Sequence, residues 1–497
     1  MMEDIMKHTR KLAVVLAALL LSSSFASCAN ESEVIDTQEN QSSVAETESD
    51  GLKDNLPNNL NYNSDEIVFI SDYPNQITSD KLTGDPVSDV VFERNKAVEQ
   101  RLNIDIACLS DSSANIVDKV ITSINGGSAD YDVVDAKCWT IAPKTVDGYF
   151  NDLRQTSYLD FDQIWWNQSF NEAISYYDSQ YIVTGAMVLS LYRRTYTTVF
   201  NKALFTNAGQ KNLYEYVEDG TWTLDKQASL VPLFYKDNGN QTQDLSGDVY
   251  GFVSNDFISV DPYWAACGVN IITKNADGDY EWVFDTNKMY DMAEKVLNLF
   301  YATNGGAYIE TDDASAETTV LNLFSSGNAA MATMVIQGLE SSEMRTMTDE
   351  YGVVPIPKYD EMQSSYRSQM HDGFSVICVP TTVQGERLDE ISAVLEAMAS
   401  SSYNLVRPVY YETTLRTKIA QDIQSSQMMD VIINNIYIDP GFVYSASMKN
   451  NDGSFHQSFQ ALIASKNNDA ASRFKTSTKS AQSALRILAK KLENLAD

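Results

Sequence analysis

The sequence predicts an α/β fold with two lobes, in which sheets are flanked by helices. The first observation is alternation: the strand-like segment Glu66–Tyr73 precedes a helical pattern, "VSDVVFERNKAVEQRLN", and a second strand, "IDIACL". A further helical pattern, "ANIVDKVITSINGGS", and the strand "YDVVDA" come next. Such alternation is typical of parallel sheets covered by helices. The second observation is length, because residues 61–497 are too many for one simple core and therefore indicate two lobes.

The start of the chain has the pattern of a secretory signal. Basic residues precede the apolar run Leu12–Leu21, and small residues follow it. This run of about ten residues is too short to cross a membrane, which takes about 20. We therefore predict a signal peptide over residues 1–27. The tetrapeptide "FASC" resembles a bacterial lipobox with Phe25 where leucine is usual, which implies that Cys28 is lipidated; an ordinary cleaved signal with an incidental cysteine is the alternative.

Residues 28–60 have the composition of a tether. Glu, Asp, Ser, Asn and Gln dominate the segment, and large apolar side chains are scarce. Such a segment cannot bury enough apolar surface to offset the entropy lost on ordering. We predict a disordered acidic leash that joins the lipid, and hence the membrane, to the folded body. By resemblance to bacterial lipoproteins, several acyl chains would make this anchor stable.

The composition of the chain disfavours several kinds of binding partner. The formal net charge is −32, with 68 acidic against 36 basic residues, so repulsion disfavours nucleic acid and anionic membrane surfaces. The cysteines after Cys28 have no CxxC spacing, and both buried thiols and a disulfide remain open for them. The four cysteines after Cys28 are Cys108, Cys138, Cys267 and Cys378. No zinc-type ligand pattern is present, and we expect neither a metal nor a cofactor.

Four ordered blocks resemble a known family. They are "RLNIDI" followed by "YDVV" and "GYFNDL"; "YIVTGAMVLSLYRRTYTTVFNKALF"; "VLNLFSSGNAAMATMVIQGLESS"; and "YGVVPIPKYD" followed by "GFSVICVPTT". Together they resemble the carbohydrate-type extracellular solute-binding proteins, the group that includes maltose-binding protein and serves ABC importers. The blocks cover most of residues 62–402, and the region after Tyr403 departs from the shortest members.

The resemblance implies a periplasmic-binding-protein-like fold of type II. It places one lobe over residues 61–184 and 354–402, and the other over 185–353 and 403–497 with the C-terminal helices. Crossings near Thr184, Val353 and Ser400 would form a multi-strand hinge. The implied function is capture of an extracellular carbohydrate between the lobes and its delivery to ABC permease subunits. The implied protein is a monomer, lipid-anchored on the outer face of the cell membrane or in a periplasm.

Candidate ligand-binding residues lie at positions that resemble the pocket loops of the family. A sugar has polar edges and apolar C–H faces, so its site should combine aromatic platforms with charged and amide groups. Trp139 follows the "YDVVDAKC" strand, whose carboxyl end should face the cleft, and Asp135 lies nearby. Of the adjacent Arg193 and Arg194, we expect one to face the cleft. The candidates are Lys137, Trp139, Arg194, Tyr196, Tyr263, Trp264, Gln337, His371 and Asp372.

Each candidate also has a purely structural interpretation. Tryptophans such as Trp139 and Trp264 often lie in a core. The side chain of His371 fits a structural hydrogen bond better than proton transfer. The pair Trp165 and Trp166 could form a second platform or a buried anchor.

Enzymatic function is the weaker alternative. A glycosidase needs two carboxylates across a cleft, and among 68 acidic residues nothing singles out a pair. The sequence has no GxSxG, HExxH or P-loop motif, and only two histidines follow the signal. We therefore predict that the protein is not an enzyme. An acidic extracellular hydrolase and a surface glycan sensor on the same fold are the alternatives.

Four local patterns add predictions about structure. "VVPIP" suits an edge or crossing strand, because Pro355 and Pro357 lack amide donors. Asp277-Gly278 indicates a hairpin turn. The segment 237–248 is interpreted as a polar turn, with a calcium loop as the alternative. Residues 472–497 have leucines at helical spacing, which predicts a C-terminal helix packed on a lobe, with partner binding as the alternative.

Overall fold

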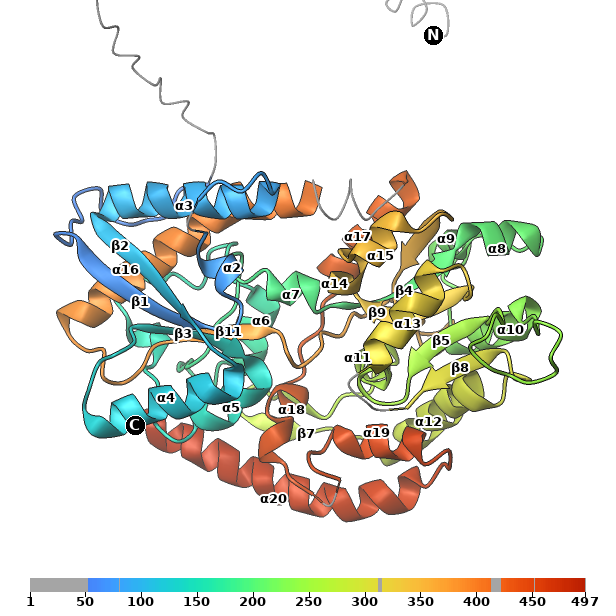
Figure 1. Ribbon diagram of the computed structural model, residues 1–497. Coiled ribbons are helices and arrows are strands. Elements are labelled where there is room, and N and C mark those ends of the chain that lie inside the picture. Colours follow the sequence, from blue (N-terminus) through green and yellow to red (C-terminus); the bar gives the residue numbers. More distant parts are fainter. Residues whose placement is uncertain (1–51, 80, 312–314, 413–421, 451, 497) are drawn as a thin grey trace, which may run out of the picture. The chain divides into compact units, whose positions relative to one another are not determined.

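The computed structural model describes residues 52–79, 81–311, 315–412, 422–450 and 452–496, which lie in one compact unit (Figure 1). The predicted signal peptide, Cys28 and most of the predicted tether lie outside these residues. Within the described part of the chain, no helix is both long enough and apolar enough to cross a membrane.

The first sheet contains four strands in the order β11-β3-β1-β2. β1 pairs in parallel with β2 and β3, whereas β11 pairs antiparallel with β3. Helix α3 begins where Asp85 accepts a hydrogen bond from the Ser88 amide and Pro86 fixes the first turn. Helices α3 and α16 pack together on one side of the sheet, and α4 lies on the opposite side (Figure 1). The alternation predicted for this region is confirmed. The bounds are β1 Asp65–Ser71, α2 Pro74–Ile77, α3 Pro86–Leu102, β2 Ile104–Ser110, α4 Ser113–Gly126, β3 Val133–Lys137, α5 Cys138–Thr145, α6 Gln168–Ile174, β11 Ser375–Cys378 and α16 Glu386–Ser401.

The second sheet contains five strands in the order β10-β4-β9-β5-β8. β5 pairs in parallel with β8 and β9, and β4 pairs antiparallel with β9 and β10. β10 is an edge strand followed directly by the Pro355 and Pro357 run, which confirms the prediction for "VVPIP". The bounds are α7 Ser190–Arg193, β4 Tyr196–Asn201, α8 Lys202–Asn207, α9 Leu213–Glu218, α10 Leu224–Phe234, β5 Phe252–Asn255, α11 Pro262–Ala266, α12 Thr286–Tyr301, β8 Ala307–Glu310, α13 Ala316–Ser325, β9 Met331–Val335, α14 Ile336–Leu339, α15 Ser342–Thr346, β10 Tyr351–Val354 and α17 Ile423–Asn434.

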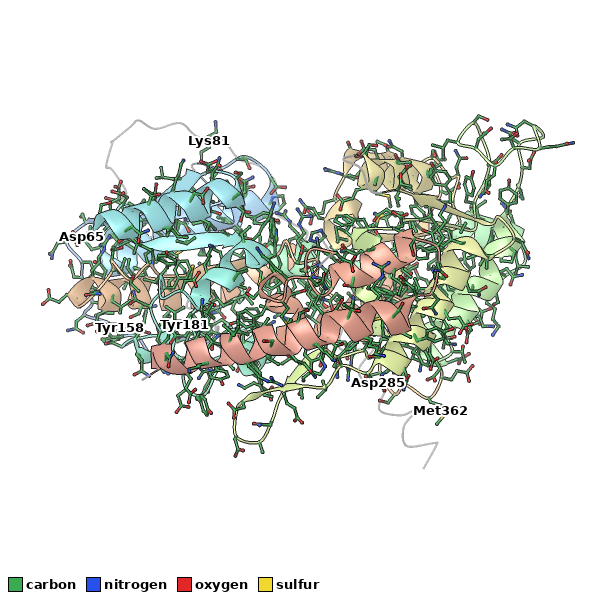
Figure 2. All side chains as sticks on the ribbon, turned by 90° about the horizontal axis from the view of Figure 1, so that it is seen from below. Asp65, Lys81, Tyr158, Tyr181, Asp285 and Met362 are labelled. Carbon is green, nitrogen blue, oxygen red and sulfur yellow. The ribbon has the colours of Figure 1, made fainter. Side chains whose placement is uncertain are left out.

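A short hairpin and three helices complete the fold. The strands β6 (Ile272–Lys274) and β7 (Tyr280–Trp282) are antiparallel, and Gly278 in their turn has φ 90°, which confirms the predicted hairpin. The predicted C-terminal helix is α20 (Ala470–Ala496), which packs against α12 and α19 (Gln457–Ala464). Figure 2 shows its length, with Tyr181 labelled toward one end and Asp285 toward the other. The remaining helix is α18, Pro440–Val443.

The C-terminal helix contacts residues of both sheet regions. Near its start, Phe474 joins a buried aromatic cluster beside α12. Near its end, the Lys491 ammonium lies 2.8 Å from Asp147 Oδ1, just after α5 of the first sheet. Leu495 lies against Gly148.

The other local predictions also have outcomes in the structure. Trp165 and Trp166 are a buried anchor rather than a platform, because both indole N–H groups donate to the buried Glu396 carboxylate at 3.0 and 2.9 Å. In the loop 237–248 the carboxylates accept hydrogen bonds within the loop itself, as when Asp237 accepts from the Gly239 and Gln241 amides, which supports the polar-turn interpretation. The thiols of Cys138, Cys267 and Cys378 are buried and not joined by disulfides.

Candidate functional site

Two adjoining cavities lie where residues of both sheet regions meet. They have volumes of about 300 and 260 Å³ and share the lining residues Arg194, Asn255 and Glu317, so they lie side by side; we call the two cavities together the groove. The first sheet contributes Lys137 and Trp139, and the second contributes the ends of several strands and helices. The second-sheet residues include Tyr196, Asn255, Ser259, Glu317, Thr333 and Gln337.

Trp139 lies in the groove at the carboxyl end of a strand. The chain leaves β3 at Lys137 and turns directly into α5, where the Trp139 amide donates to the Asp372 carbonyl at 3.3 Å. Its side chain is 46% exposed, an unusual state for so large an apolar ring. A fixed backbone and an open ring face give the groove an aromatic platform.

Arg194 and Arg193 have different surroundings. Arg193 pairs with Glu340 at 3.0 Å and does not line the groove. Arg194 lines both cavities, and its Nε donates to the Tyr73 hydroxyl at 3.2 Å. That hydroxyl in turn donates to the Gly373 carbonyl at 2.7 Å, so Tyr73 fixes the position of the Arg194 guanidinium through its Nε.

His371, Tyr196 and Gln337 also border the groove. The His371 amide donates to the Arg194 carbonyl at 2.8 Å, and its ring stacks on Tyr196 with 6.0 Å between centroids. The Tyr196 hydroxyl donates to the Ile258 carbonyl at 2.8 Å, so this residue supplies a fixed wall. Gln337, in α14 directly after β9, is exposed to the groove. The structure therefore brings together Lys137, Trp139, Arg194, Tyr196, Gln337 and His371 of the predicted set.

The predictions for Tyr263 and Trp264 are wrong, because both residues belong to the core. Trp264 is 2% exposed, and Tyr263 is fully buried with its ring 6.1 Å from that of Phe300. The short helix α11 turns them inward, away from the groove. The rings around Trp264 are Phe284, Phe455, Phe459 and Phe474, at centroid distances of 5.7 to 6.3 Å.

Asp372 is not among the residues that line the groove, so the structure does not bring it to the predicted ligand site. Its neighbours His371 and Gly373 line a cavity, whereas the Asp372 carboxylate lies 3.0 Å from His371 Nδ1 and 3.9 Å from His456 Nε2. Burial acts to raise the pKa of Asp372, but the hydrogen bond from His371 and the charges of His371, His456 and Lys137 outweigh it and lower the pKa. The carboxylate therefore orders the loop behind the groove.

Asp135, named beside Trp139 in the sequence, is buried as well. It accepts hydrogen bonds from the Ser71 hydroxyl at 2.6 Å and the Gln76 amide at 2.9 Å. Burial raises its pKa to about 6. Its role is to join the first sheet to α2.

Several residues that line the groove were not predicted from the sequence. Asn255 ends β5, and its place at the carboxyl end of a parallel strand was an available signal. Its side chain accepts from the Ser259 amide at 3.1 Å and donates to the Ser259 hydroxyl at 2.8 Å, which shapes the turn beneath the groove. Glu317 lies in the first turn of α13, and no sequence motif marks it. Phe257 and Ile258 add apolar wall.

The groove combines the chemistry needed to bind a polar solute. Lys137 and Arg194 are donors, Glu317 is an acceptor, Gln337 is both, and Trp139 offers an apolar face. In the described ranges, no group of three or more His, Cys, Asp or Glu side chains is placed to hold a metal ion. The arrangement is suited to non-covalent capture.

Comparisons with known proteins identify the fold. No protein-family model matches the sequence, and no curated protein does. The GacH receptor of Streptomyces glaucescens GLA.O, solved unliganded and with acarbose, is 15% identical with a TM-score of 0.55, covering 86% of this chain and 99% of its own. The galacto-N-biose-/lacto-N-biose I-binding protein of the Bifidobacterium longum ABC transporter, solved with lacto-N-biose, is 13% identical with a TM-score of 0.56, covering 86% and 98%.

A third similar structure binds a different kind of solute. UgpB from Mycobacterium tuberculosis, solved with glycerophosphocholine, is 15% identical with a TM-score of 0.52, covering 86% of this chain and 99% of its own. Likeness at such low identity concerns the fold and not the ligand. The chain has the two-lobed α/β fold of the type II periplasmic-binding-protein-like proteins.

Proposed function

We propose that the chain is an extracellular solute receptor that captures a carbohydrate in the groove and delivers it to the permease of an ABC importer. The observation that carries the proposal is the exposed Trp139 ring in a groove that Lys137, Arg194, Glu317 and Gln337 also line. Similar folds have been solved with acarbose and lacto-N-biose, which supports the same use here.

Binding would use the groove residues in distinct ways. The Trp139 face stacks on the C–H face of a sugar ring, and the charged and amide groups hydrogen-bond its hydroxyls. Arg194 is already positioned by Tyr73, so less conformational entropy is lost when a ligand binds. No bond is made or broken in the solute.

Delivery would depend on closure of the two predicted lobes around the solute. The lobes are residues 61–184 with 354–402, and 185–353 with 403–497, joined by crossings near Thr184, Val353 and Ser400. A ligand that contacts both walls of the groove favours the closed form in proportion to its better contacts there. The lipid on Cys28 and the tether to residue 60 would keep this monomeric receptor at the outer face of the membrane, beside its permease. The mass of the mature N-terminus tests the anchor.

A glycan library tests the proposed function. The full chain is screened for thermal stabilisation by neutral and acidic mono- and oligosaccharides, and each hit is titrated by calorimetry. We expect saturable stabilisation without any product, because ligand binding to the folded state raises its stability. Trp139→Ala should weaken binding, whereas the same change at Trp282, which does not line the groove, serves as the matched aromatic control. Turnover of the sugar, or a library without a single binder, would contradict the proposal.

A further inference from the structure

Two cations in the groove have no ion-pair partner among the residues that the structure describes. Within residues 52–79, 81–311, 315–412, 422–450 and 452–496, neither Lys137 nor Arg194 has a carboxylate oxygen within 4.0 Å, although the chain carries 68 acidic and 36 basic residues. The adjacent Arg193 shows the usual arrangement, with Glu340 at 3.0 Å. Unpaired cations that lie together in a groove leave their charge available to whatever enters it.

Three described carboxyl groups that interact with Lys137 or line the groove have other environments. Burial and the nearby Asp135 raise the pKa of Asp72 to about 7, so this neighbour of Lys137 neutralises it only in part. Asp372 is held by His371 at 3.0 Å, and its attraction to Lys137 acts over more than 4.0 Å. Glu317 lies in the first turn of α13, where the helix dipole stabilises a carboxylate without a cation.

The orientation of Arg194 adds a geometric argument. Its Nε is used by the Tyr73 hydroxyl at 3.2 Å, while its two terminal nitrogens make no hydrogen bond with the described residues. Those terminal N–H groups can grip two oxygens of one planar or tetrahedral anion. Lys137 lines the same 300 Å³ cavity, together with the Trp139 ring.

From this juxtaposition we infer that the solute carries an anionic group, a carboxylate or a phosphate, which Lys137 and Arg194 bind together while Trp139 stacks on the adjoining ring. The inference rests on the proposed function and narrows its substrate class to acidic sugars. Trp139 and Glu317 would then contact the neutral part of the ligand, through its C–H face and its hydroxyls.

Matched pairs of sugars test the inference on the full chain. Digalacturonate is compared with the neutral disaccharide of the same linkage, cellobiouronate with cellobiose, and glucose 6-phosphate with glucose. We expect the acidic member of at least one pair to bind about tenfold more tightly or better, as charged hydrogen bonds allow. The uronate and phosphate pairs show which anion is recognised. Raising the salt from about 50 to about 500 mM should weaken only the acidic ligand.

Charge-removing variants locate the effect. Lys137→Met and Arg194→Met should each weaken the acidic sugar by about tenfold and its neutral partner by less than about threefold. Lys119→Met removes a cation of the first-sheet region outside the groove and should change neither affinity. Melting curves of the unliganded variants check folding, and Arg194→Gln, which also removes the charge, replaces Arg194→Met if the latter unfolds.

The outcomes separate the two proposals. If neutral sugars bind as tightly as acidic ones in every pair, or if both variants weaken the two members equally, the inference is overturned and the carbohydrate receptor stands. If no sugar binds at all, both are overturned.

Discussion

The groove around Trp139 and the cluster around Trp264 use the same residue type in opposite ways. Trp139 is 46% exposed beside charged and amide groups, whereas Trp264 is 2% exposed among phenylalanine rings. In the sequence, both tryptophans lie at positions that resemble pocket loops of the carbohydrate-type solute-binding proteins. The neighbours, which distant segments contribute, therefore decide whether an aromatic ring stays open to a groove or fills a core.

Removing the buried indole of Trp264 should reduce stability more than any other change considered, and this tests the aromatic cluster. Trp264→Ala should lower the free energy of unfolding by about 3–5 kcal/mol, because it leaves a cavity among four phenylalanine rings. Urea denaturation of this variant and of Trp139→Ala measures the contrast, and the exposed Trp139 should cost less than about 1 kcal/mol. Unchanged stability with lost binding in Trp264→Ala would return Trp264 to the ligand site.

The buried pair Trp165 and Trp166 differs from Trp264 in its hydrogen bonds, and this difference should make stability depend on pH. Trp165 and Trp166 donate to Glu396, whereas the Trp264 indole N–H has no partner among the described residues. Burial raises the pKa of Glu396 from 4.5 to about 7. Between these values the unfolded chain ionises first, so the stabilising contribution present below pH 4.5 is lost as pH rises through about 7.

This loss should reach about 3 kcal/mol at most. Urea midpoints across the same pH range, compared between the wild-type chain and Glu396→Gln, measure it, and the variant should show a flatter profile. Because the variant also alters the hydrogen bonds to the indoles, the slope with pH is the diagnostic quantity. Parallel profiles for the two chains would show that Glu396 does not titrate in this range.

The third prediction tests the groove itself. Trp139→Ala should weaken the sugar identified in the library by about 1–3 kcal/mol, because the stacking face is lost. Calorimetric titration measures the change, and Trp139→Phe should retain part of the affinity. An unchanged dissociation constant for Trp139→Ala would show that the sugar does not bind in the groove beside Trp139.

The smallest effect is expected where the long C-terminal helix meets the first-sheet region. The Lys491 and Asp147 side chains are 46% and 34% exposed, so Lys491→Ala should cost less than about 1 kcal/mol. The adjacent Leu492 is buried, and its change to alanine should cost about 2–5 kcal/mol. Equal costs in denaturation experiments would contradict this distinction between the two sides of the helix.

Sequence patterns predicted most of the fold because the signals were local. Alternating periodicities located the first sheet, Gly278 located the hairpin, and the prolines after Val354 located an edge strand. The site was predictable where a side chain follows a strand end, as Trp139 does; Arg194, which directly follows α7 just before β4, was predicted from the family resemblance. It was not predictable for Trp264, since α11 has five residues and the rings that enclose it lie up to 210 residues further along the chain, at Phe474. The orientation of Asp372 likewise depends on His456, far away in sequence.

The 27-residue helix α20 has a mechanical consequence. It is about 40 Å long and behaves as a stiff rod. One end is embedded in the aromatic cluster through Phe474, and the other contacts Asp147 and Gly148 while its Leu488 and Leu492 side chains are buried. Because both ends are held by buried apolar side chains, a change in the separation of the two sheet regions would have to break buried contacts at one end of the helix, so that this helix resists such a change.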